Sequence, residues 1–231
     1  MKRIKFSDYE SLSVASAQEI LSLVRRQPDA KICLPTGATP ERTYELLAEL
    51  DGGRSFRQAR MVQLDEWGGL SSGAEGTCDA YLRHRVLDPL HIDENHYTSF
   101  RSDAPDPSGE CRRIQRELDL LGPMDLCLLG LGKNGHLGLN EPGPYLTPRV
   151  HVAQLTDASR EHSMLSKSKA KPTFGYTLGM GDLLRSKMIL LLVSGEQKSQ
   201  VLSRLMKETV ETDFPASFLW LHPNVLLHCD I

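Results

Sequence analysis

Two polar segments of this 231-residue chain combine residue types that can move protons. In the first, Asp65 and Glu66 directly follow an apolar run; in the second, His136 has glycines on both sides and lies close to Asn134 and Glu141. A histidine titrates near neutral pH, and a nearby carboxylate can hold its tautomer and support its charged form. A carboxylate half-buried at a strand end can have its pKa tuned for proton transfer at carbon. We therefore take these residues as candidate acids and bases.

Each segment also has a simpler interpretation. An isolated Asp-Glu pair at a strand end is usually exposed to water, and many loop histidines have no chemical task. Because adjacent side chains of an extended chain point in opposite directions, one of Asp65 and Glu66 could enter a cleft while the other faces the protein. The spacing of His136 and Glu141 matches no metal-ligand motif, and the chain has no G-x-S-x-G elbow. Neither a metal site nor a nucleophilic serine is therefore predicted.

Two further segments could bind an anion. The first comprises Thr36, Gly37, Ala38 and Thr39. Free N–H groups and two hydroxyls before a predicted helix form an anion site, and Lys198 lies at the start of another predicted helix. Taken alone, the first segment is an ordinary turn with an N-cap threonine and Pro40 at the first helical position, and Lys198 is a surface lysine. Together they indicate a phosphate clamp, and because no Walker-type loop is present, a sugar phosphate is favoured over a nucleotide.

The elements that position these segments follow from the apolar pattern. Four apolar runs of strand length precede the polar segments: 31–35, 60–64, 124–131 and 187–193. Helices are predicted at 10–26, from the turn at 35–40 to Leu50, at 78–87, and after the break at 103–107. This alternation predicts an α/β fold with a mostly parallel, doubly wound open sheet and helices on both faces. Carboxyl ends of parallel strands lie along one edge, so we expect the four polar segments to meet there.

Beyond residue 146 the pattern weakens. Residues 150–155 are predicted as a short edge strand, and the polar and basic stretch 157–171 as either a lid or an exposed connection. We also expect strands at 216–221 and 225–229, with His222 in sheet packing or a turn between them. No linker divides the chain, so residues 1–231 are expected to form a single domain.

Composition is that of a globular protein, with 40% apolar and 25% charged residues. The formal net charge of -3 argues against non-specific nucleic-acid binding. No stretch approaches the ~20 apolar residues that span a bilayer, and the basic N-terminus lacks the apolar core of a signal peptide. The five cysteines have no C-x-x-C spacing, so we expect them in a reducing compartment, with Cys33, Cys127 and Cys229 packed as small hydrophobes. A cytoplasmic protein without membrane or nucleic-acid partners is expected.

The motifs occur in a recognisable order. They are TGATP (36–40), LDEW (64–67), GLGKNGH (130–136), NEP (140–142), SGEQK (194–198) and WLHP (220–223). From about residue 30 onward, the chain resembles the glucosamine-6-phosphate deaminase/isomerase family, and the NEP motif separates it from the related 6-phosphogluconolactonases. The segments 132–141 and 215–222 look most like the galactosamine-6-phosphate isomerase/deaminase branch.

The resemblance implies a Rossmann-like fold and an aldose–ketose isomerisation with loss of ammonia that needs neither metal nor cofactor. The substrate would be galactosamine 6-phosphate or its C4 epimer, glucosamine 6-phosphate, in amino sugar catabolism. Asp65 matches the base that moves a proton between C2 and C1, His136 the residue that assists ring opening, and Glu141 its acidic partner. Thr36, Gly37, Ala38, Thr39 and Lys198 match phosphate-binding positions. A homo-oligomer is left open.

Asn134 departs from the pattern of that family, whose deaminases usually carry an aspartate two residues before the histidine. Asparagine forms hydrogen bonds but cannot hold a negative charge or take a proton. We therefore expect His136 to rely on Glu141 alone, with its protonated form less favoured. The expected consequence is a slower deamination or a shifted pH optimum, with isomerisation preserved.

Two further departures concern binding. A phosphate-binding arginine of the deaminases aligns with Leu165, and Arg160, Lys167 or Lys169 could take its place. The basic pair of the allosteric site falls on His151 and Ala153, so no activation by an N-acetylated sugar phosphate is expected.

Two other functions remain open at this point. A sugar lactonase would use His136 to activate water on a 6-phosphogluconolactone-like ester, and hydrolysis of that lactone would identify it. A sugar-phosphate sensor would bind without turnover, as related domains do in transcription regulators. The sequence has no helix-turn-helix segment or basic DNA-binding arm, which argues against the sensor.

Overall fold

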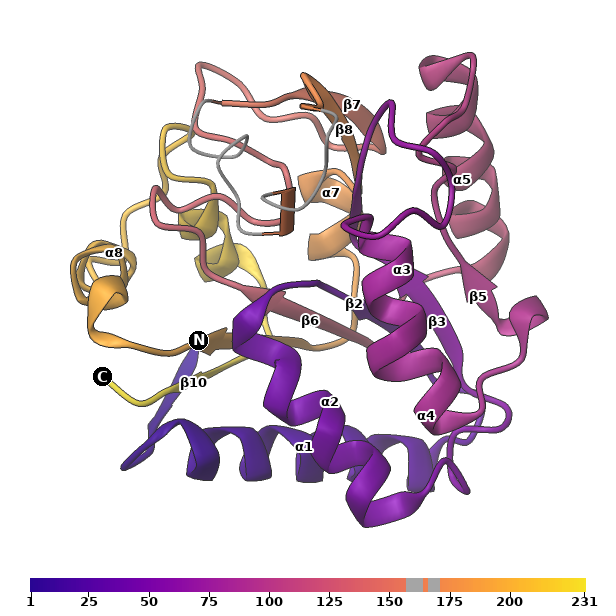
Figure 1. Ribbon diagram of the computed structural model, residues 1–231. Helices are drawn as coiled ribbons and strands as arrows, with labels where there is room; N and C mark the ends of the chain where they lie inside the picture. The colour runs from indigo at the N-terminus through magenta and orange to yellow at the C-terminus, as the bar shows by residue number, and fades with distance from the viewer. Residues whose placement is uncertain (157–163, 166–170) are drawn as a thin grey trace.

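A seven-stranded sheet runs through the centre of the molecule (Figure 1). The computed structural model describes residues 1–156, 164–165 and 171–231. In spatial order the strands are β1 (Lys2–Lys5), β10 (Val225–Cys229), β9 (Ile189–Val193), β6 (Leu126–Gly130), β2 (Lys31–Leu34), β3 (Arg60–Gln63) and β5 (Tyr97–Thr98). Every neighbouring pair in this sheet is parallel.

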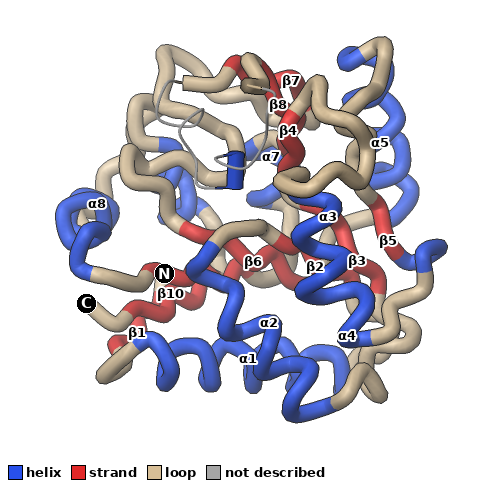
Figure 2. The backbone as a smooth tube through the Cα atoms, in the orientation of Figure 1, coloured by secondary structure: helices blue, strands red, loops and turns tan. Residues whose placement is uncertain are grey.

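Both faces of the sheet are apolar, because side chains alternate along each strand and helices cover both sides. Cys33 and Leu129 pack into one core together with α5 (Pro107–Leu121), α7 (Met180–Leu184) and α8 (Ser199–Leu205). Ile32 and Leu128 pack into the other core together with α1 (Tyr9–Arg26), α2 (Ala38–Asp51) and α4 (Asp88–Leu90). The helices lie on either side of the sheet in Figure 2. The predicted doubly wound α/β fold is confirmed.

The helices begin and end where local chemistry favours it. Asp8 caps α1, because its Oδ1 accepts a hydrogen bond of 2.7 Å from the Ser11 amide, and α5 begins at Pro107 and is followed by Gly122. The predicted helix at 78–87 is α3 (Cys78–Leu82), which continues as a π-helix (Arg83–Leu87) into α4. The Thr77 hydroxyl caps α3 by accepting from the Ala80 amide. A short 3₁₀ turn (Glu94–His96) leads into β5.

A second, antiparallel sheet stands beside the first, in the order β4 (Asp65–Trp67), β8 (Phe174–Thr177) and β7 (His151–Gln154). The chain leaves the large sheet at Leu64, whose amide donates to the Leu34 carbonyl and whose carbonyl accepts from the Leu178 amide. The run at 60–64 is therefore one strand, and Asp65 begins another. The edge strand predicted at 150–155 is confirmed as β7.

The strand predicted at 216–221 is wrong, because Pro215–Leu221 forms a 3₁₀ helix. Pro215 has no N–H to give to a sheet ladder and fits the first helical position. His222 lies in the turn that follows, as expected: its Nε2 donates to the Ser186 carbonyl at 2.7 Å, and its Nδ1 accepts from the Asn224 amide at 3.1 Å. These bonds fix the chain before β10.

All five cysteines are buried and free, and the predicted burial of Cys33, Cys127 and Cys229 is confirmed. Among the described residues, no helix is long and apolar enough to cross a membrane.

Candidate active site

The carboxyl ends of four strands bring the polar segments to one edge of the large sheet. The spatial order β9, β6, β2, β3 makes these strands direct neighbours, and their parallel registers place their ends side by side. The segments after them are 194–198, 131–141, 35–39 and 65–66. The structure therefore brings all of the predicted site segments to the edge where parallel sheets bind ligands.

Asp65 and Glu66 face opposite sides, as the extended geometry of β4 requires. Asp65 is half-buried, and burial raises its pKa to about 6, while the charge of His136 acts in the opposite direction. Asp65 and His136 thus come within electrostatic reach from two different strand ends. A carboxylate with this pKa is ionised at neutral pH yet basic enough to take a proton from carbon.

Glu66 is fully buried and holds the scaffold instead. Its carboxylate accepts hydrogen bonds from the Gln63 side chain and from the amides of Trp67, Cys78 and Asp79, at 2.7 to 2.9 Å. Burial raises the pKa of Glu66 to about 7, although these four donors act to lower it. Glu66 therefore ties the start of α3 to β4, directly beside Asp65.

Two glycines allow the loop at 132–136 to fold tightly. A Cβ on Gly132 would lie 2.4 Å from the His136 ring, and one on Gly135 would lie 2.2 Å from the Phe214 ring, at a φ of +90°. The Gly135 carbonyl accepts from the Ala216 amide at 2.8 Å, and the Gly132 amide donates to the His136 carbonyl at 3.0 Å. The His136 ring thus packs directly against the backbone of Gly132, in a turn that these hydrogen bonds fix.

Asn134 stands between His136 and Glu141. Its Oδ1 lies 2.7 Å from His136 Nδ1 and accepts from the His136 amide at 3.1 Å, and its Nδ2 donates to Glu141 Oε2 at 2.8 Å. His136 Nδ1 is 3.6 Å from Glu141 Oε2. The turn thus places the carboxamide directly on the imidazole, and the expectation that His136 relies on Glu141 for a supporting negative charge stays a prediction.

Three tyrosine hydroxyls contact the backbone carbonyls of the loop at 35–39. Tyr44 donates to the Pro35 carbonyl at 2.7 Å and Tyr81 to the Gly37 carbonyl at 2.8 Å. Tyr9 lies at 2.8 Å from the Ala38 carbonyl and 3.0 Å from that of Thr39. Four of the loop carbonyls, those of Pro35, Gly37, Ala38 and Thr39, thus contact tyrosine hydroxyls, whereas the first amides of α2 lack intrahelical partners.

The cap of α2 differs from the expected threonine cap. Gly37 is the N-cap, with a φ of +104° that glycine adopts most easily, and Pro40 is the third helical residue. Without a capping side chain, the first-turn amides are free to bind an anion. Thr36 instead donates through its hydroxyl to Cys78 Sγ at 3.6 Å.

Lys198 is half-buried in the short 3₁₀ turn (Glu196–Lys198) that precedes α8. Its ammonium donates to the Leu131 carbonyl, just beyond β6. Burial lowers the pKa of Lys198, and the charge of Lys133 adds to this effect. Only β6 lies between β9, which precedes Lys198, and β2, which precedes the loop at 35–39.

The segment that could carry a further phosphate ligand is only partly described. Leu165 packs in an apolar cluster with Trp67, Leu139 and Leu155, so it does not take the place of the family arginine. Arg160, Lys167 and Lys169 lie outside the described residues.

The tyrosines at 9, 44 and 81 and the scaffold role of Glu66 were not recognised from the sequence. Tyr44 belongs to the buried stripe of its helix, but Tyr9 and Tyr81 contact the loop from 29 and 44 residues away. No local pattern indicates such pairings. The described residues contain no group of three His, Cys, Asp or Glu side chains that could hold a metal ion.

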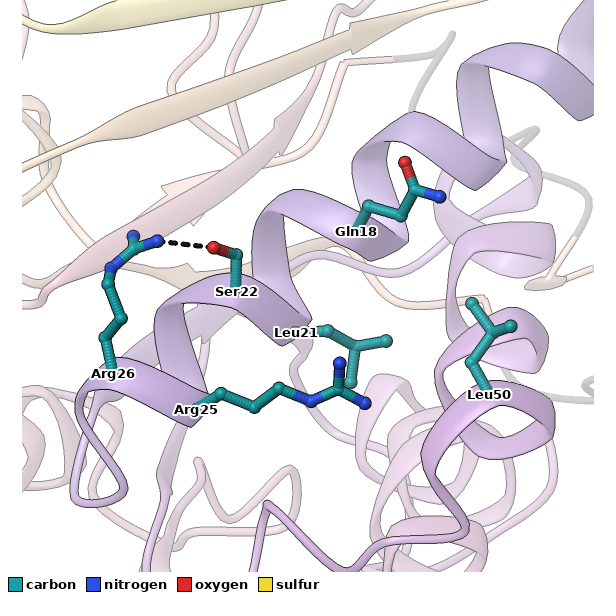
Figure 3. A pocket seen from close by; sticks show the side chains of 6 residues that line it. All are labelled: Gln18, Leu21, Ser22, Arg25, Arg26 and Leu50. Atoms are coloured by element: carbon teal, nitrogen blue, oxygen red, sulfur yellow. Dashed lines mark hydrogen bonds between the residues drawn. The ribbon is translucent and has the colours of Figure 1, made fainter.

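A hollow between α1 and α2 lies at the opposite edge of the sheet (Figure 3). It is lined by Gln18, Leu21, Ser22, Arg25, Arg26 and Leu50. Both helices begin at the carboxyl edge and run back, so their last turns lie at the amino ends of the strands. None of the predicted site residues reaches this hollow.

Comparison with known proteins supports the resemblance. AgaI of Escherichia coli (strain K12) is 42% identical over 221 residues, which are 95% of this chain and 88% of AgaI. Its name describes it as a candidate deaminase. Glucosamine-6-phosphate deaminase 1 of Bacillus subtilis (strain 168) is 37% identical, with 100% of this chain and 97% of that protein covered. A solved structure of a monomeric glucosamine-6-phosphate deaminase matches with a TM-score of 0.94 at 35% identity, over 99% of this chain and 97% of that one.

The family described as glucosamine-6-phosphate isomerases/6-phosphogluconolactonase matches residues 9–227, which is nearly the whole chain. With relatives above 30% identity along its full length and the strand-end motifs gathered at one edge, this chain belongs to the glucosamine-6-phosphate isomerase/6-phosphogluconolactonase family.

Proposed function

We propose that this protein is an amino sugar 6-phosphate isomerase/deaminase, converting galactosamine 6-phosphate, or its C4 epimer glucosamine 6-phosphate, to the ketose 6-phosphate and ammonia. One observation carries the proposal: Asp65, with a pKa of about 6, lies within electrostatic reach of His136, which joins Asn134 and Glu141 in a hydrogen-bonded row. A site for ring opening thus adjoins a site for proton transfer at carbon.

Ring opening falls to His136. In the closed sugar, the proton of the C1 hydroxyl must leave and the ring oxygen must gain a proton. An imidazole with one free nitrogen can take the proton of the C1 hydroxyl and deliver a proton to the ring oxygen. Its other nitrogen is held by Asn134, so the ring keeps one orientation throughout.

Isomerisation falls to Asp65. Its carboxylate takes the proton from C2 of the open aldose while the C1 aldehyde oxygen gains a proton, which gives an enolamine. Return of the carboxyl proton to C1, with loss of one proton from the amino nitrogen, converts the enolamine to a ketimine at C2. Addition of one water at C2 and loss of ammonia then give the ketose, so one water is consumed for each ammonia released. A carboxylate whose pKa lies near 6 suits both the removal and the return of the proton.

Phosphate binding falls to the loop at 36–39 and to Lys198. The free first-turn amides of α2 attract an anion, and the tyrosine bonds fix the loop that presents them. The ammonium of Lys198 can exchange the Leu131 carbonyl for a phosphate oxygen, which forms a stronger, charge-assisted bond.

The test is to incubate the protein with each epimer and to measure both ammonia and ketose 6-phosphate. We expect both products in equal amounts, and the epimer with the larger kcat/KM is the preferred substrate. Formation of the ketose from an amino sugar must release ammonia, so the two products should appear together. If neither ammonia nor ketose 6-phosphate forms from either epimer, the proposal is contradicted. Hydrolysis of 6-phosphogluconolactone in a parallel assay, with no ammonia from either epimer, would instead identify a lactonase.

A further inference from the structure

The arrangement at Asn134 fixes more than the position of His136. The two ends of the Asn134 carboxamide meet partners of fixed polarity: the His136 amide can only donate, and the ionised Glu141 carboxylate can only accept. The carbonyl oxygen must therefore face His136 and the amino group must face Glu141. Exchanging the two would set two donors against each other at one end.

The proton on the imidazole follows from this orientation. His136 Nδ1 lies 2.7 Å from Asn134 Oδ1, and that oxygen can only accept. Nδ1 must therefore carry a hydrogen, and in the neutral ring Nε2 is then the nitrogen with the free lone pair. A carboxylate at position 134 would also accept from Nδ1, but its negative charge would favour the doubly protonated, charged ring.

We propose that Asn134 is a positioning residue that holds His136 as the neutral Nδ1–H tautomer, so that Nε2 serves as a base toward the sugar C1 hydroxyl. The proposal rests on the proposed function for its catalytic half only. Glu141 acts through Asn134: its carboxylate accepts from Nδ2 at 2.8 Å, but lies 3.6 Å from the imidazole Nδ1. Among the described residues, the carboxylates that interact with the ring are those of Glu141 from its own loop and Asp65 from β4.

As a consequence, the two bases of the site differ in charge: Asp65 is ionised and His136 is neutral. Asp65 brings a negative charge to the candidate site, while the carboxamide adds none to the imidazole. A neutral His136 and an ionised Asp65 are both bases, so His136 is ready to take the C1 hydroxyl proton of the closed sugar and Asp65 to take the C2 proton of the open aldose. An aspartate at 134 would convert one of these bases into a charged acid.

The first test needs no substrate. Nitrogen-15 NMR of the imidazole, with His136→Gln to identify its signals, should show a protonated Nδ1 and a bare Nε2 at neutral pH. Free imidazole side chains prefer the Nε2–H form, so Asn134→Ala should move the signals toward that form. A wild-type ring with the proton on Nε2, or an Asn134→Ala ring unchanged from wild type, would overturn the proposal.

The second test uses the isosteric Asn134→Asp, with Asn95→Asp as the matched control on an exposed turn before β5. Asn134→Asp should keep Nδ1 protonated and hold the ring charged, which moves the acidic limb of kcat upward by about one pH unit or more. Asn134→Ala should lower kcat about tenfold with KM nearly unchanged, as expected for one lost hydrogen bond.

An unchanged pH profile in Asn134→Asp, or an Asn134→Ala effect confined to KM, would overturn the catalytic half of the proposal. If no variant and no wild-type protein turns over either epimer, the proposed function fails, while the NMR signals still decide the tautomer. The two failures are therefore distinguishable.

Discussion

The two loops that meet at the carboxyl edge are held in different ways. The loop at 35–39 is fixed through its carbonyls by the hydroxyls of Tyr9, Tyr44 and Tyr81. The loop at 132–141 is fixed through side chains that themselves belong to the candidate site, above all Asn134 and Glu141. In the first loop the supporting groups are separate from the binding groups, whereas in the second they are the same.

The two loops should therefore contribute to different steps, the loop at 35–39 to phosphate binding and the loop at 132–141 to proton transfer. Burial raises the pKa of each of the three tyrosines above its usual value, so their hydroxyls stay protonated through the neutral range. The loop at 35–39 should therefore present the same amides at any moderate pH. The other loop depends on the ionisable side chains of His136 and Glu141, whose hydrogen bonds depend on their protonation. We expect pH and substitution to affect kcat through one loop and KM through the other.

Replacing Asp65 should give the largest effect. Asp65→Asn removes the base for C2 and should lower kcat about 10²- to 10⁴-fold, with phosphate binding nearly intact because the loop at 35–39 is untouched. The measurement is exchange of the C2 proton with deuterium from solvent, alongside the dissociation constant of the substrate. A variant that still exchanges the proton would remove Asp65 as the base.

The same variant should be more stable than the wild type. Because the folded-state pKa of Asp65 is about 6, above its usual value near 3.8, the folded protein binds this proton more tightly than the unfolded chain. The contribution to stability is full below pH 3.8 and is lost as the pH rises through 6. Asp65→Asn should therefore raise the free energy of unfolding at pH 7, by up to about 3 kcal/mol. Urea unfolding at pH 7 measures this change, and a destabilised variant would mean that its loss of activity has a structural cause.

Replacing Lys198 should affect binding more than chemistry. Lys198→Ala removes a charge-assisted bond of about 1.5–3 kcal/mol, so KM should rise roughly 10- to 100-fold with a smaller change in kcat. Lys207→Ala, an exposed lysine just beyond α8, is the matched control and should change neither constant. Equal losses in kcat and KM for Lys198→Ala would break the separation between the two loops.

The pH dependence should divide in the same way. Asp65 must be ionised to take the C2 proton, so kcat/KM should fall toward tenfold per pH unit below about pH 6. On the alkaline side, loss of the Lys198 charge should weaken phosphate binding, at a pH below the usual 10.5 because burial lowers the pKa of Lys198. Two measurements over this pH range separate the acidic limb from the alkaline limb. Kinetics give kcat/KM, and the dissociation constant of a non-reacting sugar phosphate gives binding alone. If the dissociation constant of the non-reacting sugar phosphate rose below pH 6 together with the fall in kcat/KM, by more than the titration of the phosphate explains, Asp65 would also affect binding. That result would argue against a separation of binding from chemistry.

Which parts of this arrangement the sequence could predict depends on how local the signal is. Apolar runs such as 124–131 indicate buried strands, and parallel topology then brings their ends together without further information. The run at 216–221 is equally apolar, and only Pro215 at its start hints at the 3₁₀ helix that forms. The position of Asn134 on the imidazole arises from a turn that a Cβ on Gly132 or Gly135 would obstruct, and this geometry is invisible in the residue types alone.

Removing one tyrosine hydroxyl should give the smallest effect and the sharpest test of the comparison. Tyr81→Phe deletes the 2.8 Å bond to the Gly37 carbonyl but keeps the ring, so the loop at 35–39 should loosen without losing a phosphate ligand. One neutral hydrogen bond contributes about 0.5–1.5 kcal/mol, which corresponds to a rise in KM of roughly two- to tenfold with kcat unchanged. Tyr97→Phe is the matched control, because its buried hydroxyl has no hydrogen-bond partner within the described part of the chain. If Tyr81→Phe lowered kcat instead, the loop at 35–39 would contribute to the chemistry as well as to binding, and the two loops would not be independent.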